Sequence, residues 1–597
     1  MEKRKLFGGG EFLITEVAPE HIFVPEEMTQ EHQMIYDAAM DFVKKEIQPN
    51  LDRIEEKDEA YARSLFRTAG ELGLNGTDVP EAYGGEGMDK ISTCLVTEAV
   101  ATAAGASFAV AHGAHTGIGT LPIVYFGNED QKKRYLSKLA AGEWIAAYCL
   151  TEPNAGSDAL NAQTTAVLSE DGTHYLLNGE KIYITNGAWA DLFIVYAKVD
   201  GEKFTGFIVE RTFPGVSHGP EEKKMGIKGS STTPIIFKDC QVPVENVLFE
   251  VGQGHKIAFN VLNIGRYKLG ASVVGGCKLA VTEAAKYATL REQFGKKICS
   301  FGMIKNKLAD MSIKTYIAES MVYRMAAALD DILSARTEEE VQDPAANART
   351  IEEYAVECSI AKIFGSETLD FCADELVQIY GGNGYTAEYP VERMYRDARI
   401  NRIFEGTNEI NRLLIAATLF RRAMKGRLAL LEAVEQVQEM LNRGAPEPQK
   451  TPDSGPLALQ DHYLKAGKKI FLLAAGIAAN QLMMALEQEQ EVVALLADMV
   501  MEIYAMESGL LRAQKVLKKK GGTTADYHAA AVKVYINDTL PGILNRAKQV
   551  VAFVEKKDQL PRLYGAIDTL AGYQPMDTIP LRRFIADKVI KGKKYPF

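Results

Sequence analysis

The spacing of apolar residues divides the chain into helical, β and helical regions. From about residue 30 to 147, apolar residues recur at the periodicity of an amphipathic helix. In EHQMIYDAAMDFVKKEI (31–47) these positions are Ile35, Ala39, Phe42, Val43 and Ile47. The same periodicity returns near residue 255 and continues to about 425. We therefore expect two helical domains that flank a different kind of structure.

The middle region, from about 148 to 254, has the pattern of an all-β domain. Asp171-Gly172 and Asn178-Gly179 each lie between short β-prone runs, and both dipeptides are typical of two-residue hairpin turns. Three further runs continue the strands: DLFIVYAKV (191–199), FTGFIVER (204–211) and TPIIFKDCQV (233–242). Because helices and strands do not alternate, the pattern does not fit a doubly wound nucleotide-binding fold.

The stretch GNGYTA (382–387) matches the G-x-G-x-x-[GA] pattern of dinucleotide-binding turns. Such a fingerprint follows a strand and opens a helix, whereas here a helical-looking segment, DELVQIY (374–380), precedes the glycines and Pro390 follows them. We therefore interpret these glycines as a turn, and we expect any dinucleotide to be held in another way.

The pattern as a whole predicts a mainly α protein with a central β domain. A polar segment rich in proline and glycine, NRGAPEPQKTPDSGP (442–456), predicts a linker, and the chain beyond it is helical. The expected units are an N-terminal extension (1–29), an N-terminal helical domain (30–147), a middle β domain (148–254), a helical domain (255–425), a connecting segment with the linker (426–458) and a C-terminal helical domain (459–597).

Composition narrows the class of protein. The chain has 597 residues, of which 47% are hydrophobic and 25% charged, as in ordinary globular proteins. A net charge of -11 argues against nucleic acid as the main partner, because phosphate backbones require basic surfaces. The seven cysteines form no CxxC pair and no metal-ligand spacing, which predicts a reducing compartment and no metal site.

The chain start and its most apolar run bear on location. MEKRKLFGGGEFLITE begins with basic residues but lacks the apolar region of a signal peptide. The run IFLLAAGIAA (470–479) is shorter than the roughly 20 apolar residues that span a bilayer. We therefore expect a cytoplasmic protein.

Five segments carry candidate chemistry. They are YCLTEPNAGSDA (148–159), KIYITNG (181–187), REQFGK (291–296), QIYGGNGYTAEYP (378–390) and NRIFEGTNEINR (401–412). In this order and at these separations they resemble the acyl-CoA dehydrogenase family, over about residues 30 to 425. FGMIKNKLADM, LNIGRYKLGA and the long C-terminal region are most similar to the very-long-chain branch. The resemblance implies a helical bundle, a β-barrel and a second helical bundle, followed by an extra C-terminal helical domain.

Glu405 lies between Phe404 and Gly406, and the resemblance implies that it is the catalytic base that removes the α-proton of an acyl thioester. Such a base must be ionised yet poorly solvated, and an apolar neighbour raises a carboxylate's pKa toward the operating pH. Gly406 lets the substrate pass close to the backbone. The Glu405 N–H is implied to help hold the thioester carbonyl.

Two observations weigh on that assignment. By itself the pattern also fits an ordinary loop glutamate paired with Arg402 or Arg412. Some branches of the family carry the base just before an arginine that corresponds to Arg266, and this chain has Gly265 at that position. Glu405 is therefore left without a rival.

The resemblance implies FAD as the cofactor, because removal of hydride from a β-carbon requires an electron acceptor. The residues that match the flavin-ring segments are Tyr148, Leu150, Thr151, Tyr183 and Thr185. Many relatives have tryptophan where Tyr183 stands, and a tyrosine ring offers a smaller face for packing. Without the resemblance, KIYITNG also fits a plain strand that enters a turn.

Other matches concern the rest of the cofactor. Arg291 matches the arginine that meets the FAD pyrophosphate, a task suited to a bidentate guanidinium, although by itself it also fits a helix-end arginine. The neighbouring residues assigned to the cofactor are Gln293 and Phe294, with Thr407 after the base. Gln378, Gly381 and Gly382 match a segment that reaches the FAD of a neighbouring subunit, although the glycines alone also fit a simple turn. This implies an obligate homo-oligomer.

Substrate contacts follow from the same resemblance. The residues assigned to coenzyme A and its thioester are Ser157, Asn263, Arg266 and Gly406, and several relatives have aspartate where Asn263 stands. SFAVAHGAHTGIG (107–119) aligns with the helix at the base of the family's acyl cavity. The small residues Gly113 and Ala114 predict a deep pocket for long acyl chains, although Gly113 could instead serve helix packing.

These assignments predict FAD-dependent α,β-dehydrogenation of a fatty acyl-CoA, with electrons passed to an electron-transferring flavoprotein. An acyl-CoA oxidase, a dehydrogenase of another thioester and a non-catalytic acyl-CoA-binding protein are the alternatives. The C-terminal region resembles that of dimeric relatives, so a dimer is favoured. Lys465, Lys468 and Lys469 precede the apolar run, which fits either a peripheral membrane helix or a helix buried against its neighbours.

Overall fold

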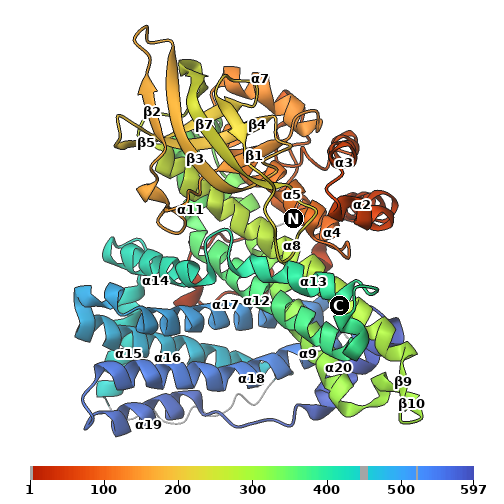
Figure 1. The fold of residues 1–597 in the computed structure, drawn as a ribbon. Coiled ribbons are helices and arrows are strands. Elements are labelled where there is room, and N and C mark those ends of the chain that lie inside the picture. Colours follow the sequence, from red (N-terminus) through yellow and green to blue (C-terminus); the bar gives the residue numbers. More distant parts are fainter. Residues whose placement is uncertain (1–3, 444–454, 520–521) are drawn as a thin grey trace.

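The computed structural model describes residues 4–443, 455–519 and 522–597. The sheet lies at one end of the molecule and a bundle of long helices at the other, with the N-terminal helices beside the sheet (Figure 1). The long helix α8 (Gly254–Leu290) runs from the sheet toward the opposite end. The predicted fold class, mainly α with a central β domain and an added C-terminal helical domain, is confirmed.

Residues 30–140 form a group of short helices whose starts follow local sequence signals. The side chains of Thr29, Asp58, Asp89 and Asn128 each accept a hydrogen bond from a backbone N–H of the first turn. The helices are α1 (Gln30–Phe42), α2 (Leu51–Glu55), α3 (Glu59–Glu71), α4 (Lys90–Val100), α5 (Ser107–Ala114), α6 (Leu121–Phe126) and α7 (Glu129–Ala140).

The middle domain is one mixed sheet. Its strand order is β6-β7-β3-β2-β4-β5-β8, and β1 pairs in parallel with β4. β4 and β5 are buried almost throughout, which explains their continuous apolar runs. The strands are β1 (Ala146–Cys149), β2 (Thr165–Leu168), β3 (His174–Thr185), β4 (Leu192–Val199), β5 (Lys203–Glu210), β6 (Val216–His218), β7 (Thr232–Pro243) and β8 (Val247–Leu248).

The two predicted hairpin turns have different outcomes. Asp171-Gly172 forms the turn between β2 and β3, as predicted. Asn178-Gly179 lies inside β3, so the prediction of a second hairpin there is wrong. The pairing of β3 with β7 shifts register at this point, and a Cβ on residue 179 would overlap Thr164 on the neighbouring segment. The glycine therefore permits a bulge and a close approach of backbones.

The second helical region is built around α8 and α12 (Ala355–Tyr380), which pack along each other. GNGYTA follows α12 and begins with a 3₁₀ turn, so it is not a dinucleotide fingerprint. The other elements are the hairpin β9 (Glu292–Gln293) and β10 (Lys296–Lys297), and the helices α9 (Gly302–Ser334), α10 (Glu338–Gln342), α11 (Pro344–Glu353), α13 (Val391–Ala398) and α14 (Asn408–Met424).

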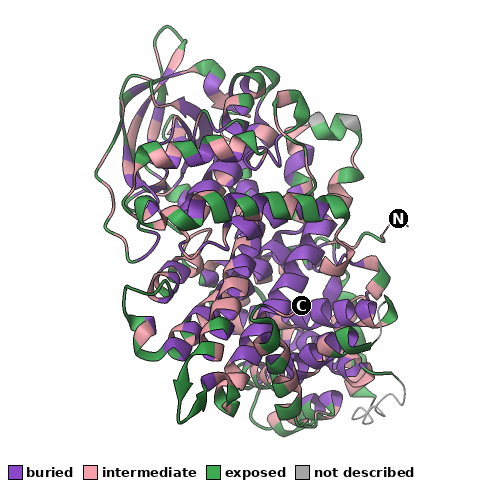
Figure 2. Ribbon diagram, turned by 90° about the vertical axis from the view of Figure 1, so that its right-hand side faces the viewer, coloured by how far each residue is buried: buried purple, intermediate pink, exposed green. Residues whose placement is uncertain are grey.

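The C-terminal helices form a bundle against α9, α12 and α14. Most of the predicted linker lies outside the described residues, and residues 430–442, which we expected in the connecting segment, form a helix. The segment Ala458–Gln488, which contains α16, is long and apolar enough to cross a membrane by length and composition, and 39% of its most apolar window is buried. Most residues of α16 itself are buried in the bundle. Figure 2 shows buried residues throughout the centre of the molecule and exposed ones along its outer helices. The helices are α15 (Leu430–Asn442), α16 (Ala458–Leu482), α17 (Gln490–Lys519), α18 (Gly522–Val554), α19 (Leu560–Ala571) and α20 (Ile579–Gly592).

Residues 4–28, here called the N-terminal segment, contact both the second helical region and the C-terminal bundle. The backbone N–H groups of Gly9 and Gly10 donate to the side chains of Glu353 and Glu357, each at 2.8 Å. On the C-terminal bundle, Lys515 donates to the Ile22 carbonyl at 2.5 Å. This docking could not be predicted from the residue pattern, because its partners lie more than 300 residues away along the chain.

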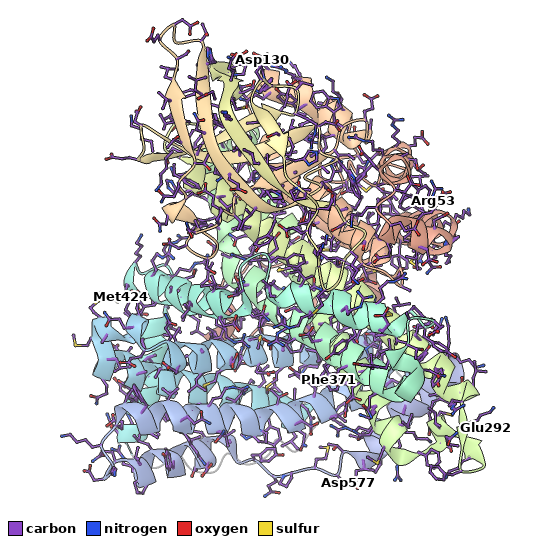
Figure 3. All side chains as sticks on the ribbon, viewed as in Figure 1. Arg53, Asp130, Glu292, Phe371, Met424 and Asp577 are labelled. Atoms are coloured by element: carbon purple, nitrogen blue, oxygen red, sulfur yellow. The ribbon has the colours of Figure 1, made fainter. Side chains whose placement is uncertain are left out.

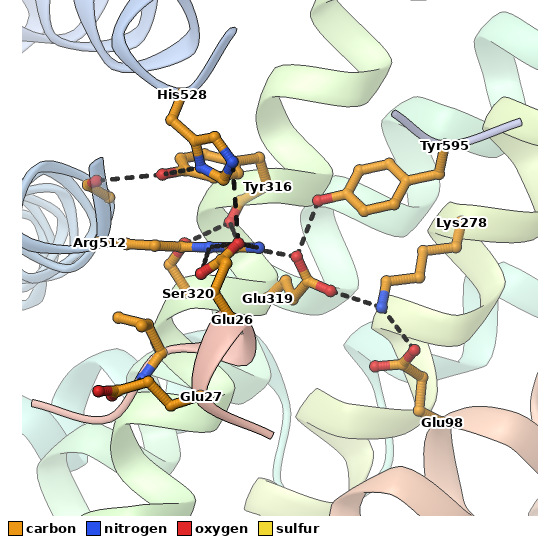
Figure 4. Close-up of polar contacts among 12 residues, drawn as sticks. Glu26, Glu27, Glu98, Lys278, Tyr316, Glu319, Ser320, Arg512, His528 and Tyr595 are labelled. Carbon is orange, nitrogen blue, oxygen red and sulfur yellow. Dashed lines mark hydrogen bonds and ion pairs between the residues drawn. The ribbon is translucent and has the colours of Figure 1, made fainter. Parts of the chain in front are cut away.

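A buried ion network joins the same parts (Figure 4). Arg512 on α17 contacts Glu26 of the N-terminal segment and Glu319 on α9, each at 2.7 Å. Lys278 on α8 contacts Glu319 at 2.5 Å and Glu98 on α4 at 2.6 Å. Because these charges are buried and mutually paired, they define how the C-terminal bundle docks on the rest of the protein.

Candidate functional site

Glu405 lies in a turn of unusual backbone conformation between Arg402 and the start of α14. Its φ is +58°, and that of Gly406 is +78°. The left-handed region is costly for a residue with a side chain, by roughly 1–3 kcal/mol, and it persists only where the surroundings enforce it. Thr407 follows as the N-cap of α14, and its hydroxyl accepts a hydrogen bond from the Ile410 N–H at 3.2 Å.

Side chains from three helices hold the carbonyl groups of this turn. Arg266 on α8 donates to the Glu405 carbonyl at 3.2 Å. Lys362 on α12 donates to the Gly406 carbonyl at 2.8 Å. Asn411 on α14 donates to the same Gly406 carbonyl at 2.8 Å. These three side chains are buried, so the left-handed turn is fixed from three sides.

The Glu405 carboxylate points toward α8, where Gly265 leaves room for it. A Cβ on residue 265 would lie 2.5 Å from Glu405 Oε2. Oε2 is itself buried and has no hydrogen-bond partner among the residues that the structure describes. Some branches of the family carry the base at the position of Gly265. In this chain that position has no side chain, and the Glu405 carboxylate occupies the space. An unpartnered carboxylate oxygen is free to accept a proton.

The electrostatics of the turn suit a general base. Burial raises the pKa of Glu405 to about 7, against the opposing effect of the positive charges on Arg266 and Lys362. Arg402 pairs instead with Asp370 at 3.1 Å. Arg412 pairs with Glu367 and Asp498, at 2.9 and 2.7 Å. The interpretation of Glu405 as a loop glutamate paired with either arginine is therefore wrong.

The residues matched to the flavin ring gather at the edge of the sheet next to this turn. Tyr148 lies on β1, close to the Glu405 carboxylate. Burial raises the pKa of the Tyr148 hydroxyl, and the negative charge of Glu405 raises this pKa further. Leu150 and Thr151 follow β1 directly, and the Thr151 carbonyl accepts a hydrogen bond from the backbone of the β3 strand at 2.9 Å. Together they place part of the sheet edge beside the base.

On β3, Tyr183 and Thr185 complete this group. Tyr183 has a φ of +59° and is 63% exposed, whereas the next residue on the strand, Ile184, is buried. A large aromatic side chain held in open space at a strained position fits a surface that a ligand ring covers. Beneath it, Lys181 and Glu152 form a buried ion pair at 2.7 Å, which ties β3 to the segment after β1.

A second group of predicted cofactor residues lies elsewhere. Arg291, Gln293 and Phe294 belong to the hairpin region after α8, and Phe294 is 91% exposed. Figure 3 places Glu292, on this hairpin, at the opposite end of the molecule from Asp130, on α7 beside the sheet. The Tyr148 hydroxyl, at the sheet edge, donates to the Ala258 carbonyl near the start of α8, whereas the hairpin follows the end of this 37-residue helix. A helix of that length extends roughly 55 Å, so within one chain the hairpin is remote from the sheet edge.

The remaining matched residues lie beside that hairpin. Gln378, Gly381 and Gly382, at the end of α12, are exposed. The stacked rings of Tyr287 and Tyr380, 3.9 Å apart, join the ends of α8 and α12. The predicted cofactor residues therefore form two separate surfaces rather than one.

The predicted substrate residues differ in their surroundings. Asn263 and Arg266 are buried, and Arg266 donates to Asn263 Oδ1 at 2.8 Å, so the two form a unit under the base. Ser157 is exposed in the loop after β1. At Gly113, on α5, a Cβ would meet no atom within 4 Å, so the described residues supply no packing contact that requires glycine there.

Lys362 and Asn411 are functional candidates that the sequence interpretation did not include. Both donate to backbone carbonyls of the turn, and such contacts leave no trace in residue patterns. One signal was available for Lys362: it interrupts the apolar helical run SIAKIFG (359–365), and a charge within such a run predicts a buried partner.

Comparisons with known proteins agree with this arrangement. Family models described as "Acyl-CoA dehydrogenase, N-terminal domain", "middle domain" and "C-terminal domain" match residues 29–143, 147–240 and 252–420, and another C-terminal domain model matches 466–567. The chain is 48% identical to a probable acyl-CoA dehydrogenase of Bacillus subtilis (strain 168) over 587 residues, 98% of each chain.

Two further relatives bear on the fold and the branch. A crystal structure of an acyl-CoA dehydrogenase complexed with FAD from Bacillus anthracis is 50% identical, with a TM-score of 0.96, covering 99% of this chain and 100% of that one. The mitochondrial very long-chain specific acyl-CoA dehydrogenase of Homo sapiens is 40% identical over 417 residues, 68% of this chain and 60% of the human protein.

Proposed function

Because this chain belongs to the acyl-CoA dehydrogenase family, we propose that it oxidises a fatty acyl-CoA to the trans-2-enoyl-CoA, in the manner of fatty acid β-oxidation. The observation that carries the proposal is the Glu405 carboxylate, whose Oε2 is buried without a partner in the space left by Gly265. With a pKa of about 7, it is ionised in a large fraction of molecules at neutral pH.

In the proposed reaction, Glu405 takes the proton from the α-carbon of the thioester. FAD, when bound, supplies the acceptor for the hydride that leaves the β-carbon, and the carbon–carbon double bond forms between the two atoms. Arg266, Lys362 and Asn411 hold the carbonyl groups of the base's turn, which leaves its N–H groups free to face the site. The buried surroundings exclude water from the proton transfer.

The residues present fit FAD. Tyr183 and Thr151 at the sheet edge offer an exposed ring and a hydroxyl on the segments next to Tyr148, suited to a flavin ring. Arg291 and the glycines after α12 offer a guanidinium and open backbone, suited to a pyrophosphate, on a surface remote from the first. We propose that the second surface serves the cofactor of a neighbouring copy, so that the protein is an obligate homo-oligomer, with a dimer favoured.

The test of the reaction class uses the purified holoenzyme without oxygen. Addition of a saturated acyl-CoA should bleach the oxidised flavin and yield one equivalent of trans-2-enoyl-CoA. A flavoprotein that binds acyl-CoA but keeps its colour would contradict the proposal and favour a binding protein. Admission of air after bleaching separates a dehydrogenase, which re-oxidises slowly, from an acyl-CoA oxidase.

We propose a preference for long acyl chains. The open space at Gly113 supports it, as does the likeness to very long-chain relatives. Each buried CH₂ of substrate contributes about 0.8 kcal/mol, so a deeper pocket favours longer chains. Gly113→Phe should abolish activity on long chains and spare short ones. Equal loss at all chain lengths would mean that residue 113 only packs, and the chain-length proposal would fail.

The electron acceptor and the location of the protein complete the proposal. An electron-transferring flavoprotein is the acceptor that the family resemblance implies, and reduction of such a protein by the acyl-CoA-reduced enzyme is the test. We propose a cytoplasmic protein whose α16 is a core helix. Lys468 is buried, contacting Glu507 at 2.5 Å, and Lys465 contacts Glu16 at 3.2 Å, so two of the lysines considered for a peripheral membrane contact have protein partners.

A further inference from the structure

Lys362 is a buried lysine next to the base that the family assignment leaves without a role. Its side chain, on α12, is fully buried. The ammonium donates to the Gly406 carbonyl at 2.8 Å and to Asn408 Oδ1 at 2.7 Å. Asn408 is held in turn by Ser366 and Glu367 on α12, each at 3.1 Å. The ammonium is thus held between a backbone carbonyl of the turn and a side-chain amide that α12 itself fixes.

The contacts of Lys362 are to the backbone of the turn rather than to the carboxylate. Neither Lys362 nor Arg266 forms an ion pair with Glu405 within the described ranges 4–443, 455–519 and 522–597. A direct ion pair would neutralise the base and lower its affinity for a proton. A cation held one peptide unit away has the same effect in weaker form: it lowers the cost of ionising the carboxylate and leaves Oε2 free.

A neutral side chain could make the hydrogen bond to Gly406 without bringing a charge into the interior. Burial disfavours the charged lysine enough to lower its pKa to about 7, although the negative charge of Glu405 opposes this effect. Paired groups whose pKa values are shifted in opposite directions are typical of sites of acid–base chemistry. The presence of a charge where a neutral donor would be less costly indicates that the charge itself has a use.

We propose that Lys362 is a positioning residue for the base: it fixes the left-handed turn through the Gly406 carbonyl and, when protonated, places a positive charge beside the Glu405 carboxylate. This inference rests on the proposed function. The charged and titratable groups around the pair, all of which remain in the variants below, are Arg266 on α8, Tyr148 on β1, Cys358 and Glu367 on α12, and Glu409 on α14.

Lys362→Met tests both parts, because it keeps the length of the side chain and removes its charge and its donor. In the pH profile of kcat/KM for flavin reduction by acyl-CoA, the acid limb reports ionisation of the base in free enzyme. We expect this limb to move upward by roughly 0.5–1 pH unit, because a nearby positive charge is lost. At the high-pH plateau, kcat should fall by roughly 10- to 100-fold, because a displaced base reacts more slowly.

Matched variants separate this role from a merely structural one. Lys362→Gln retains an N–H donor without the charge, so its acid limb should move while its plateau kcat falls less than that of Lys362→Met. If Lys362→Met does not retain flavin, the acid limb of Lys362→Gln tests the role of the charge. Lys278→Met removes a partly buried lysine, which pairs with Glu98 and Glu319, and should lower thermal stability without moving the acid limb.

An acid limb that stays in place in the Lys362 variants, with plateau kcat within twofold of the wild type, would overturn the proposal. So would an equal shift in Lys278→Met. Failure of the proposed function is a different result: there, the wild-type flavin is not reduced by any saturated acyl-CoA, and no pH profile exists to be moved.

Discussion

At the scale of the residue, the site depends on the carboxylate of Glu405 and on the absence of a side chain at Gly265. Glu405 can occupy its buried position only because residue 265 is glycine. We predict that Gly265→Ala, whose Cβ would lie 2.5 Å from Oε2, displaces the carboxylate. Displacement of a catalytic group by about 1 Å lowers rates roughly 100-fold, so kcat should fall to that extent while FAD is retained.

The control for this prediction is Gly565→Ala, since a Cβ there meets no atom within 4 Å and the residue lies in α19, a helix of the C-terminal bundle. Its kcat should equal that of the wild type. A Gly265→Ala enzyme of full activity would show that the carboxylate does not need this space.

The residue pattern singled out Glu405, the proposed base, but not the groups that hold its turn. An aromatic residue, a glutamate and a glycine in sequence mark Glu405 locally, and the resemblance gave it a role. Lys362 contacts a carbonyl 44 positions along the chain, and Asn411 contacts carbonyls of its own turn. Neither contact alters the hydrophobic periodicity of its helix. Both are therefore visible only in the folded structure.

At the scale of the element, local signals were reliable where the local sequence alone determines the structure. The Asp171-Gly172 turn forms because strands of matching pattern flank it. The glycine of Asn178-Gly179 is used differently, because Thr164 on a neighbouring segment needs the space of its missing side chain. A tertiary contact of this kind is invisible to turn propensities.

The N-terminal segment supplies a prediction at this scale. A Cβ on Gly9 would overlap the Glu353 carbonyl oxygen and the Arg422 guanidinium. Gly9→Ala should therefore detach the segment from α11 and α14, make residues 4–28 sensitive to limited proteolysis and lower the thermal midpoint. Gly302→Ala is the control, because a Cβ there meets no atom within 4 Å. Equal protection of the segment in Gly9→Ala and wild type would count against tight docking.

At the scale of the whole molecule, the C-terminal bundle is joined to the rest by the network of Figure 4. Arg512→Ala would leave Glu26 and Glu319 buried without their shared partner. Removal of one member of a buried ion network costs about 3–5 kcal/mol, so we predict a large fall in thermal stability at pH 7. Arg443→Ala, which removes an exposed pair with Glu439, should change stability by at most about 1 kcal/mol.

The acid dependence of this effect has a definite direction. Despite the opposing effect of burial, the positive charges of Lys278 and Arg512 lower the pKa of Glu319 to about 2. The stability contributed by the ionised carboxylate is therefore present above its unfolded pKa, near 4.5, and is lost as pH falls toward 2. The difference between Arg512→Ala and wild type should shrink over that range. A constant difference would indicate that lost packing, not charge, is responsible.

The two separate cofactor surfaces lead to a prediction about assembly. Arg291→Ala and Tyr183→Ala, each expressed alone, should lose FAD, because each damages one half of every site. Co-expression should restore flavin and activity in part, since a mixed dimer joins an intact sheet edge to an intact hairpin. Absence of any recovery in mixed dimers, verified by mass, would argue that each chain completes its own cofactor site.

The central claim is that Glu405 is the base of an acyl-CoA dehydrogenase, and its most direct test is the rate of anaerobic flavin reduction by a saturated acyl-CoA as a function of pH. In the wild type we predict that kcat/KM falls as pH decreases through about 7, because the carboxylate becomes protonated. Glu405→Gln should keep its flavin and bind acyl-CoA, lose at least roughly 10²–10⁴-fold in rate, and show no acid limb near pH 7. A Glu405→Gln enzyme that reduces its flavin at the wild-type rate with the same pH profile would contradict the claim.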